Sequence, residues 1–314
     1  MRPSRWGRRL TRSQREDLNG RLLVAPTALV VVLVVILPFL AVILFSVAHI
    51  RLIDIPRLTL NNITFTTDNF AHALSSQSFW SGFGTTIAYA SLTTIGAIVG
   101  GLAVGLALRR PFRGRGLIRA GLLIPYVLPV VAAAAIWKTL LNPQYGVVNA
   151  LGKTILGWDA PIAFLSTTSQ TFAGVHVPVT LFTVVAFEIW KTTPLAFLFI
   201  TARLQVMPAE PEEAAALDGA NSRQVFWHII FPQLRGVVIL LVLLRFIWSF
   251  QSFNDIYLLT GGAGGTQVLA IRIYTELITR ADIGSAAAYG LVMTAILAVL
   301  LSFVVIVNRR GERL

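Results

Sequence analysis

Six long apolar stretches, separated by short polar and basic segments, divide most of the chain. They cover about residues 22–48, 80–108, 119–141, 174–202, 236–260 and 283–307. An α-helix needs roughly 20 predominantly apolar residues to cross the hydrocarbon core of a bilayer, and each stretch reaches that length. The pattern predicts an all-α, polytopic membrane protein with six transmembrane helices, which form one domain over residues 22–308.

The first apolar stretch has a second interpretation, as a secretory signal peptide. Basic residues precede it, and Ser46-Val47-Ala48 resembles a cleavage site. However, the apolar core of a signal peptide is only about 7 to 15 residues long, and this stretch is longer. We therefore expect a retained span, with residues 1–21 as a basic tail before it and residues 309–314 as a tail after the sixth span.

Composition and charge agree with a membrane location. Of the 314 residues, 55% are hydrophobic and only 13% are charged, so the exterior is expected to face membrane lipid. The net charge of +12 does not indicate nucleic-acid binding, because the basic residues form short clusters between apolar runs. Eighteen of the 26 Lys and Arg residues lie in the two tails and in the loops at residues 109–119 and 203–235. Positive loops stay inside, which predicts that both termini are cytoplasmic.

The sequence offers no site for a metal, a cofactor or ATP. It contains no cysteine, and its four histidines are scattered without the spacing of metal ligands. Residues 146–154 approach a phosphate-binding loop, but five residues rather than four separate the two glycines. We therefore expect no catalytic site, no metal site and no bound cofactor in this chain.

The most informative loop, residues 208–232, lies between the fourth and fifth apolar stretches. Pro211 favours a helix start, Gly219 favours a left-handed turn, and Asn221 or Ser222 favours the N-terminus of a second helix. The loop also holds four acids on a side of the membrane dominated by arginine, namely Glu210, Glu212, Glu213 and Asp218. The prediction is a helical hairpin, which either lies at the membrane interface or fits a groove of a partner protein.

Two groups of polar residues lie within the predicted spans. Glu188 and Lys191 are costly in lipid, so the fourth span must face protein or water; their spacing also allows an ion pair within the helix. On a helical projection of the fifth span, one continuous polar arc contains Arg245, Trp248, Ser249, Gln251, Ser252 and Asp255. A polar arc beside aromatic rings suits a sugar, although Arg245 and Asp255 could instead stabilise the helix bundle.

Several motifs resemble one family. Glu213-Ala214-Ala215, then Asp218-Gly219-Ala220, with Ile229 and Pro232 following, resembles the EAA loop of the permease subunits of binding-protein-dependent ABC importers. Further segments resemble the carbohydrate-uptake branch of that family, so that the likeness covers about residues 20–308; they are Pro125-Tyr126, Asn142-Pro143, Trp190-Lys191, Leu204-Gln205, Asn254-Asp255, Thr260-Gly261-Gly262 and Asp282-Ile283-Gly284. Ala263 departs from the proline that many relatives have after the paired glycines.

The resemblance implies a function for the hairpin. In this family the EAA helix docks into separate ATPase subunits, which implies a coupling role for Glu213, Ala214, Asp218, Gly219 and Ala220. The implied partners are a second, homologous permease, two ATP-binding cassette subunits that bind ATP and Mg, and an extracytoplasmic solute-binding protein. The implied cargo is a sugar, an oligosaccharide or a related polyol, moved across the bacterial inner membrane by alternating access.

Two other functions are compatible with the residues. An ion-coupled secondary transporter would use Glu188 or Asp255 as a proton site, although we find no inverted repeat of the kind common in such transporters. A non-transporting assembly or sensor subunit would use the acidic hairpin to dock a different cytoplasmic protein.

Overall fold

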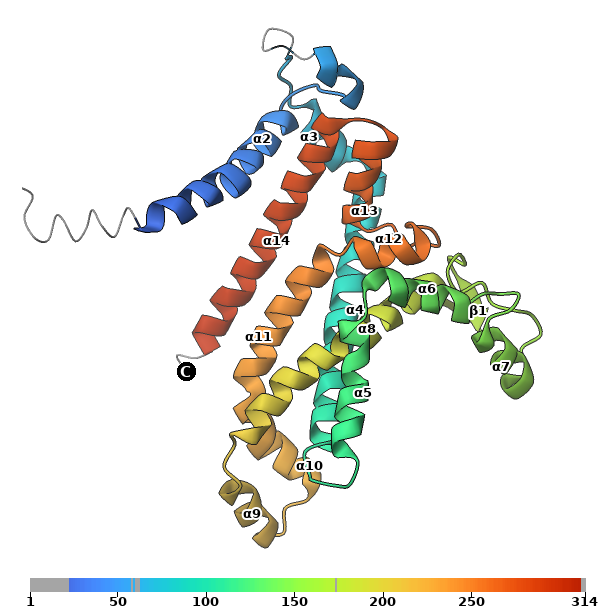
Figure 1. The fold of residues 1–314 in the computed structure, drawn as a ribbon, viewed down its shortest axis with the longest axis vertical. Helices are drawn as coiled ribbons and strands as arrows, with labels where there is room; N and C mark the ends of the chain where they lie inside the picture. Colours follow the sequence, from blue (N-terminus) through green and yellow to red (C-terminus); the bar gives the residue numbers. More distant parts are fainter. Residues whose placement is uncertain (1–22, 58, 60–62, 173, 312–314) are drawn as a thin grey trace, which may run out of the picture.

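The computed structural model describes residues 23–57, 59, 63–172 and 174–311 (Figure 1). The expected basic tail at residues 1–21 and the last three residues of the C-terminal tail lie outside the described residues. The described part is an elongated helical bundle with one short β-hairpin. At one end, drawn at the bottom of Figure 1, a helical hairpin protrudes; short helices gather toward the opposite end.

The elements in the first half of the chain are mostly helices. The first helix covers Leu23–Ser46 and contains a π-helical turn at Val32–Ile36 followed by α2 (Leu37–Ser46). Next come a 3-10 turn (Leu52–Arg57), α3 (Asp68–Ser75), α4 (Gln77–Ala107), α5 (Arg115–Val127), α6 (Val130–Leu140) and α7 (Val147–Leu156). Strands β1 (Gln170–Phe172) and β2 (Val175–Val177) form an antiparallel pair, with Thr171 opposite His176.

The second half of the chain continues with helices. These are α8 (Val179–Gln205), α9 (Glu210–Leu217), α10 (Ser222–Val225), a π-helical turn (Phe226–Ile230), α11 (Phe231–Phe250), α12 (Asn254–Thr260), α13 (Leu269–Tyr274), a second π-helical turn (Thr275–Thr279) and α14 (Ile283–Gly311). Five helices of the described part are long and apolar enough to cross a membrane: Leu23–Ser46, Gln77–Ala107, Val179–Gln205, Ser222–Phe250 and Ile283–Ser302.

The third predicted span, residues 119–141, is not one straight helix. It is divided into α5 and α6, which meet at an angle of 99° and together form the sixth candidate crossing. Leu128, between them, has an extended backbone with φ −62° and ψ 134°, and Pro129 follows it. The ring of a proline disfavours the helical conformation of the preceding residue, which accounts for the position of the break.

The fifth predicted span, residues 236–260, is displaced toward the N-terminus in the structure. The helix begins at Ser222 and ends at Phe250, and α12 is a separate short helix. The helix continues past Pro232 because a π-helical turn precedes it, in which the amide of Phe231 donates to the carbonyl of Phe226. The expected loop 208–232 is therefore shorter, and its second helix is the start of this span.

Helices α4 and α8 pack closely along most of their length. Four glycines of α4 face α8: Gly96 lies against Ile189, Gly100 against Thr193, Gly101 against Ala196 and Gly105 against Ile200. A β-carbon at Gly101 would lie 2.6 Å from the β-carbon of Ala196 and 2.7 Å from the amide nitrogen of Phe197. Small residues allow helix backbones to approach closely in lipid, and here they make α4 and α8 one packed pair.

The buried core follows this pair. Buried side chains of α4 and α8, such as Tyr89, Phe187 and Ile200, pack with residues of α11, α12 and α13. A separate cluster around Phe79 and Tyr289 joins α4 to α14. The first helix, by contrast, has no buried residue in its most apolar part, and α2 packs on α14.

Candidate functional site

The hairpin at one end of the bundle consists of α9, a turn and α10, residues 210–225. Pro211 lies in the first turn of α9 with three acids, so the positive end of the helix dipole is next to negative charge. Gly219 makes the turn with φ +80°, a conformation that glycine adopts at little cost. Asn221 then caps α10: its side chain accepts from the amide of Gln224 at 3.0 Å, and the Gln224 side chain accepts from its amide at 2.8 Å.

The residues with an expected coupling role lie on the surface of this hairpin. Glu213, Ala214, Asp218 and Gly219 are exposed, and Ala220 is half-buried. Leu217, between them, is 90% exposed, which is unusual for a large apolar side chain. The hairpin forms one tip of the molecule (Figure 1), and exposed acids and the exposed Leu217 lie on it.

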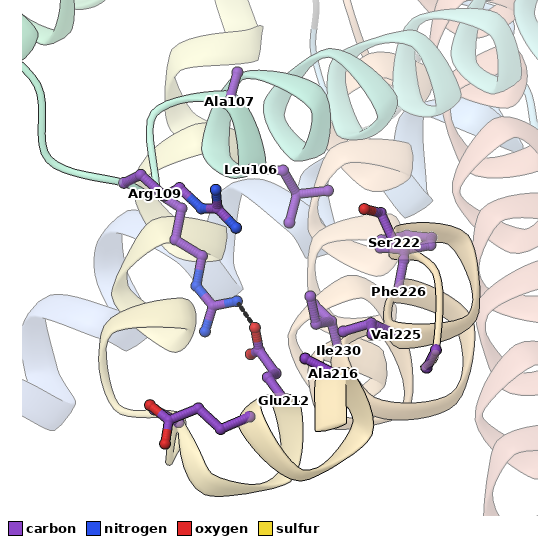
Figure 2. A pocket seen from close by; sticks show the side chains of 13 residues that line it. Leu106, Ala107, Arg109, Glu212, Ala216, Ser222, Val225, Phe226 and Ile230 are labelled. Carbon is purple, nitrogen blue, oxygen red and sulfur yellow. Dashed lines mark hydrogen bonds and ion pairs between the residues drawn. The ribbon is translucent and has the colours of Figure 1, made fainter. Parts of the chain in front are cut away.

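A cavity of about 650 Å³ separates the hairpin from the end of α4 (Figure 2). Arg109, just after α4, and Glu212 of α9 reach across it, with Nη1 and Oε2 2.7 Å apart. The remaining lining is partly apolar, from Leu106, Val225, Phe226 and Ile230. From the sequence alone, Arg109 is only one of several basic loop residues, because its partner is 103 positions away.

Four charged side chains form a connected set of ion pairs between α8, α11 and α12, here named the four-charge set: Glu188, Lys191, Arg245 and Asp255. Arg245 Nη2 lies 2.9 Å from Glu188 Oε1, and Lys191 Nζ lies 3.3 Å from Glu188 Oε2. Lys191 also pairs with Asp255. The two acids and two bases compensate each other, which is the condition under which buried charges are tolerated.

The predicted polar arc of the fifth span is divided in the structure. Because α11 ends at Phe250, Asp255 reaches the fourth span from α12, not from the same helix. Arg245, Ser249 and Ser252 are buried, and the Ser252 hydroxyl donates to Asp255 at 3.4 Å. Trp248 and Gln251 are exposed. The role of these residues in a substrate pathway stays a prediction, and the pairing of Glu188 with Arg245 and of Lys191 with Asp255 required the structure.

Glu276 is a second buried acid, outside the residues that the sequence analysis indicates. Glu276 is 1% exposed, and its Oε1 lies 3.2 Å from both Arg272 Nε and Arg280 Nη1. Both arginines are four positions from Glu276, so helical spacing could have indicated the pairs. Among the described residues, no group of three or more potential ligands could hold a metal ion.

Comparison with known proteins identifies the family. Residues 93–313 match the family described as the binding-protein-dependent transport system inner membrane component. The chain belongs to this family. The matched region includes the hairpin, the four-charge set and the helices that carry them. The chain is thus a multi-pass inner-membrane permease component of an ABC transporter, which favours the ATP-driven interpretation over the ion-coupled one.

Individual relatives agree over most of the chain. An inner membrane ABC transporter permease, YcjO of Escherichia coli (strain K12), is 35% identical over 264 residues, covering 82% of this chain and 86% of that protein. The trehalose/maltose transport system permease MalF of Thermococcus litoralis is 32% identical over 259 residues, covering 82% of each. A bacterial alginate ABC transporter shares the fold, with a TM-score of 0.79 at 19% identity, covering 96% of this chain and 98% of that chain.

Proposed function

We propose that the chain is one of two permease subunits of an ATP-driven importer for a sugar, an oligosaccharide or a related polyol. The observation that carries this proposal is the family match over residues 93–313, which spans the hairpin and both helices that flank it. The trehalose/maltose permease among the relatives supports a saccharide cargo. The second permease would be homologous, and the translocation pathway would lie between the two.

The energy would come from other subunits. Two ATP-binding cassette subunits would bind ATP and Mg and would dock on the hairpin, through Glu213, Ala214, Asp218, Gly219 and Ala220. Leu217 is 90% exposed, and burial of such an apolar side chain against a partner is favourable. The hairpin surface, with Leu217 and the exposed acids near it, therefore supports such docking. Because the ATPase subunits are cytoplasmic, the hairpin would lie on the cytoplasmic side of the membrane, together with both termini.

Transport would proceed by alternating access. A solute-binding protein would deliver the cargo at the opposite side of the membrane, and closure of the ATPase subunits would displace the hairpin and reorient the pathway. The hairpin is suited to this, because α10 continues into a helix of the membrane domain without a break. Rigid elements of this kind transmit rigid-body motion.

The substrate pathway would pass the C-terminal end of α11 and the start of α12. Trp248 and Gln251 offer an aromatic ring and an amide at the surface, which suit the C–H faces and hydroxyls of a sugar. Deeper in the protein than Trp248 and Gln251, the same route would be lined by Arg245, Glu188, Ser252 and Asp255. In this structure these four are engaged with each other and with Lys191, so Trp248 and Gln251 are the first candidates for direct contact.

Uptake by the complete complex in proteoliposomes tests the proposal. We expect accumulation of a labelled saccharide, delivered by its binding protein, that requires internal ATP and is unaffected by ionophores that collapse proton and sodium gradients. Uptake that an ion gradient drives in the absence of ATP would instead establish the secondary-transport alternative. An intact complex that moves no cargo would support the assembly or sensor alternative.

A further inference from the structure

The contact between Arg109 and Glu212 joins α9 to the end of α4 across a cavity, beside which Val225 of α10 and Leu106 of α4 pack against one apolar cluster. Arg109 follows the last turn of α4, and Glu212 lies in the first turn of α9. Their side chains are 25% and 23% exposed, so water screens the pair only in part. In Figure 2 the guanidinium points from the α4 side directly toward the carboxylate.

This contact has few substitutes. Among the described residues, no other hydrogen bond or ion pair connects α9 with the end of α4. The intervening cavity measures about 650 Å³, so the two elements are not packed together at this place. Without the ion pair, α9 would be held mainly through its chain connections and through α10.

On its other side, Arg109 is attached to the most closely packed helices of the bundle. Gly105, one turn before it on α4, lies against Ile200 of α8, and Gly101 is in tighter contact with Ala196. Further along α8 lie Glu188 and Lys191, whose ion pairs reach α11 and α12. Packed helices therefore connect the end of α4 with the four-charge set.

We propose that Arg109 is a positioning residue, which through Glu212 fixes the hairpin to the α4–α8 pair. When an ATPase subunit displaces the hairpin, this contact makes α4 and α8 move with it. Without the contact, α9 changes its distance from α4 across the cavity, and part of the displacement is lost. The proposal rests on the proposed function, because it assigns the hairpin an ATP-driven displacement.

The first measurement is the number of ATP molecules hydrolysed per cargo molecule imported by the reconstituted complex. We expect Arg109→Gln and Glu212→Gln each to raise this ratio by about two- to fivefold, the range that loss of a partly exposed ion pair can produce. The reversed pair, Arg109→Glu with Glu212→Arg, should return it toward the wild-type value. Arg110→Gln is the matched control, since Arg110 is adjacent, equally charged and lines the same cavity without an ion pair among the described residues.

The second measurement is a distance and does not depend on transport. Because the chain has no cysteine, spin labels can be placed, in the permease without its ATPase subunits, at Leu217→Cys on α9 and Val99→Cys on α4, both of which are exposed. We expect the distribution of distances to broaden with Arg109→Gln and to stay unchanged with Arg110→Gln.

The outcomes separate the two proposals. An unchanged distance distribution in Arg109→Gln, or an unchanged ATP-to-cargo ratio, would overturn the role of Arg109. So would equal losses of ATPase activity, transport and assembly that the reversed pair does not restore, since these indicate a merely structural contact. If wild-type uptake needs no ATP, the proposed function fails, and the role of Arg109 in coupling fails with it; the distances then decide only whether the contact holds the hairpin.

Discussion

The carboxylate of Glu188 on α8 accepts a hydrogen bond from the guanidinium of Arg245 on α11, with Oε1 and Nη2 2.9 Å apart. Both side chains are almost fully buried, at 5% and 4% exposure. The removal of one member of a buried pair leaves the other charge without compensation. Each residue of the pair is therefore needed to compensate the buried charge of the other.

We predict that Glu188→Gln lowers the free energy of unfolding by about 3–5 kcal/mol, because Arg245 is left buried without its carboxylate. The double change Glu188→Leu with Arg245→Leu should recover much of this loss, while Lys191 and Asp255 remain paired. Thermal unfolding of the purified protein in detergent measures both. Asp159→Asn, at an exposed acid, is the control and should leave the melting temperature unchanged. Equal stability of Glu188→Gln and the wild type would contradict a structural role for the pair.

The glycines of α4 allow a comparison within one helix. A β-carbon at Gly101 would lie 2.7 Å from the backbone nitrogen of Phe197, whereas at Gly84 it would meet nothing within 4 Å. Gly101→Ala should therefore destabilise the protein by about 1–3 kcal/mol, as overpacking does. Gly84→Ala should be neutral or stabilising by up to about 1 kcal/mol, because alanine favours the helix. The same unfolding assay distinguishes them, and a reversed order would show that α4 and α8 do not pack as described.

The turn of the hairpin allows a test that leaves the membrane domain unchanged. Gly219 has φ +80°, and a β-carbon built there would meet nothing within 4 Å, so a side chain meets backbone strain without a collision. Gly219→Val should abolish most uptake while assembly with the partner subunits is retained, because a β-branched residue resists this conformation. Gly219→Asn should be much milder, since asparagine tolerates left-handed backbone. Normal uptake by Gly219→Val would show that the shape of the turn is not needed for coupling.

The proposed orientation can be checked by labelling single cysteines. Leu217 on the hairpin is 90% exposed and Tyr145, between α6 and α7, is 69% exposed. In intact cells that lack the ATPase subunits, a membrane-impermeant maleimide should modify Tyr145→Cys but not Leu217→Cys, and the same cells should react at both positions once permeabilised. The unchanged chain has no cysteine and gives the background. Labelling of Leu217→Cys in intact cells would place the hairpin outside and would exclude docking to cytoplasmic ATPase subunits.

The sequence predicted most long helices because apolar length is a local property. It did not predict the 99° angle between α5 and α6, although Pro129 was visible. A proline within an apolar run is compatible with a modest kink or a complete break, and contacts with other helices decide between them. The end of α11 at Phe250 has no proline or glycine to mark it; there, Asp255 and Ser252 meet side chains of α8 and α4 that are distant in sequence.

The candidate site was predicted unevenly for the same reason. The hairpin could be read from Pro211, Gly219 and Asn221, since caps and turns depend on neighbouring residues. The partners of Arg109 and Arg245 could not, since each lies more than fifty positions away. Long-range pairs of this kind depend on how the helices are arranged, which no single segment encodes.

The uninterrupted helix of 29 residues from Ser222 to Phe250 has a geometric consequence. At a rise of 1.5 Å per residue, Arg245 lies about 35 Å from the hairpin end of this helix. A tilt of only about 10° about that end would shift Arg245 sideways by about 6 Å, roughly twice the length of a hydrogen bond. The ion pairs between α8 and α11 must then either break or move together with both helices. A small rotation of this helix at the hairpin would therefore decide between two arrangements of the buried charges.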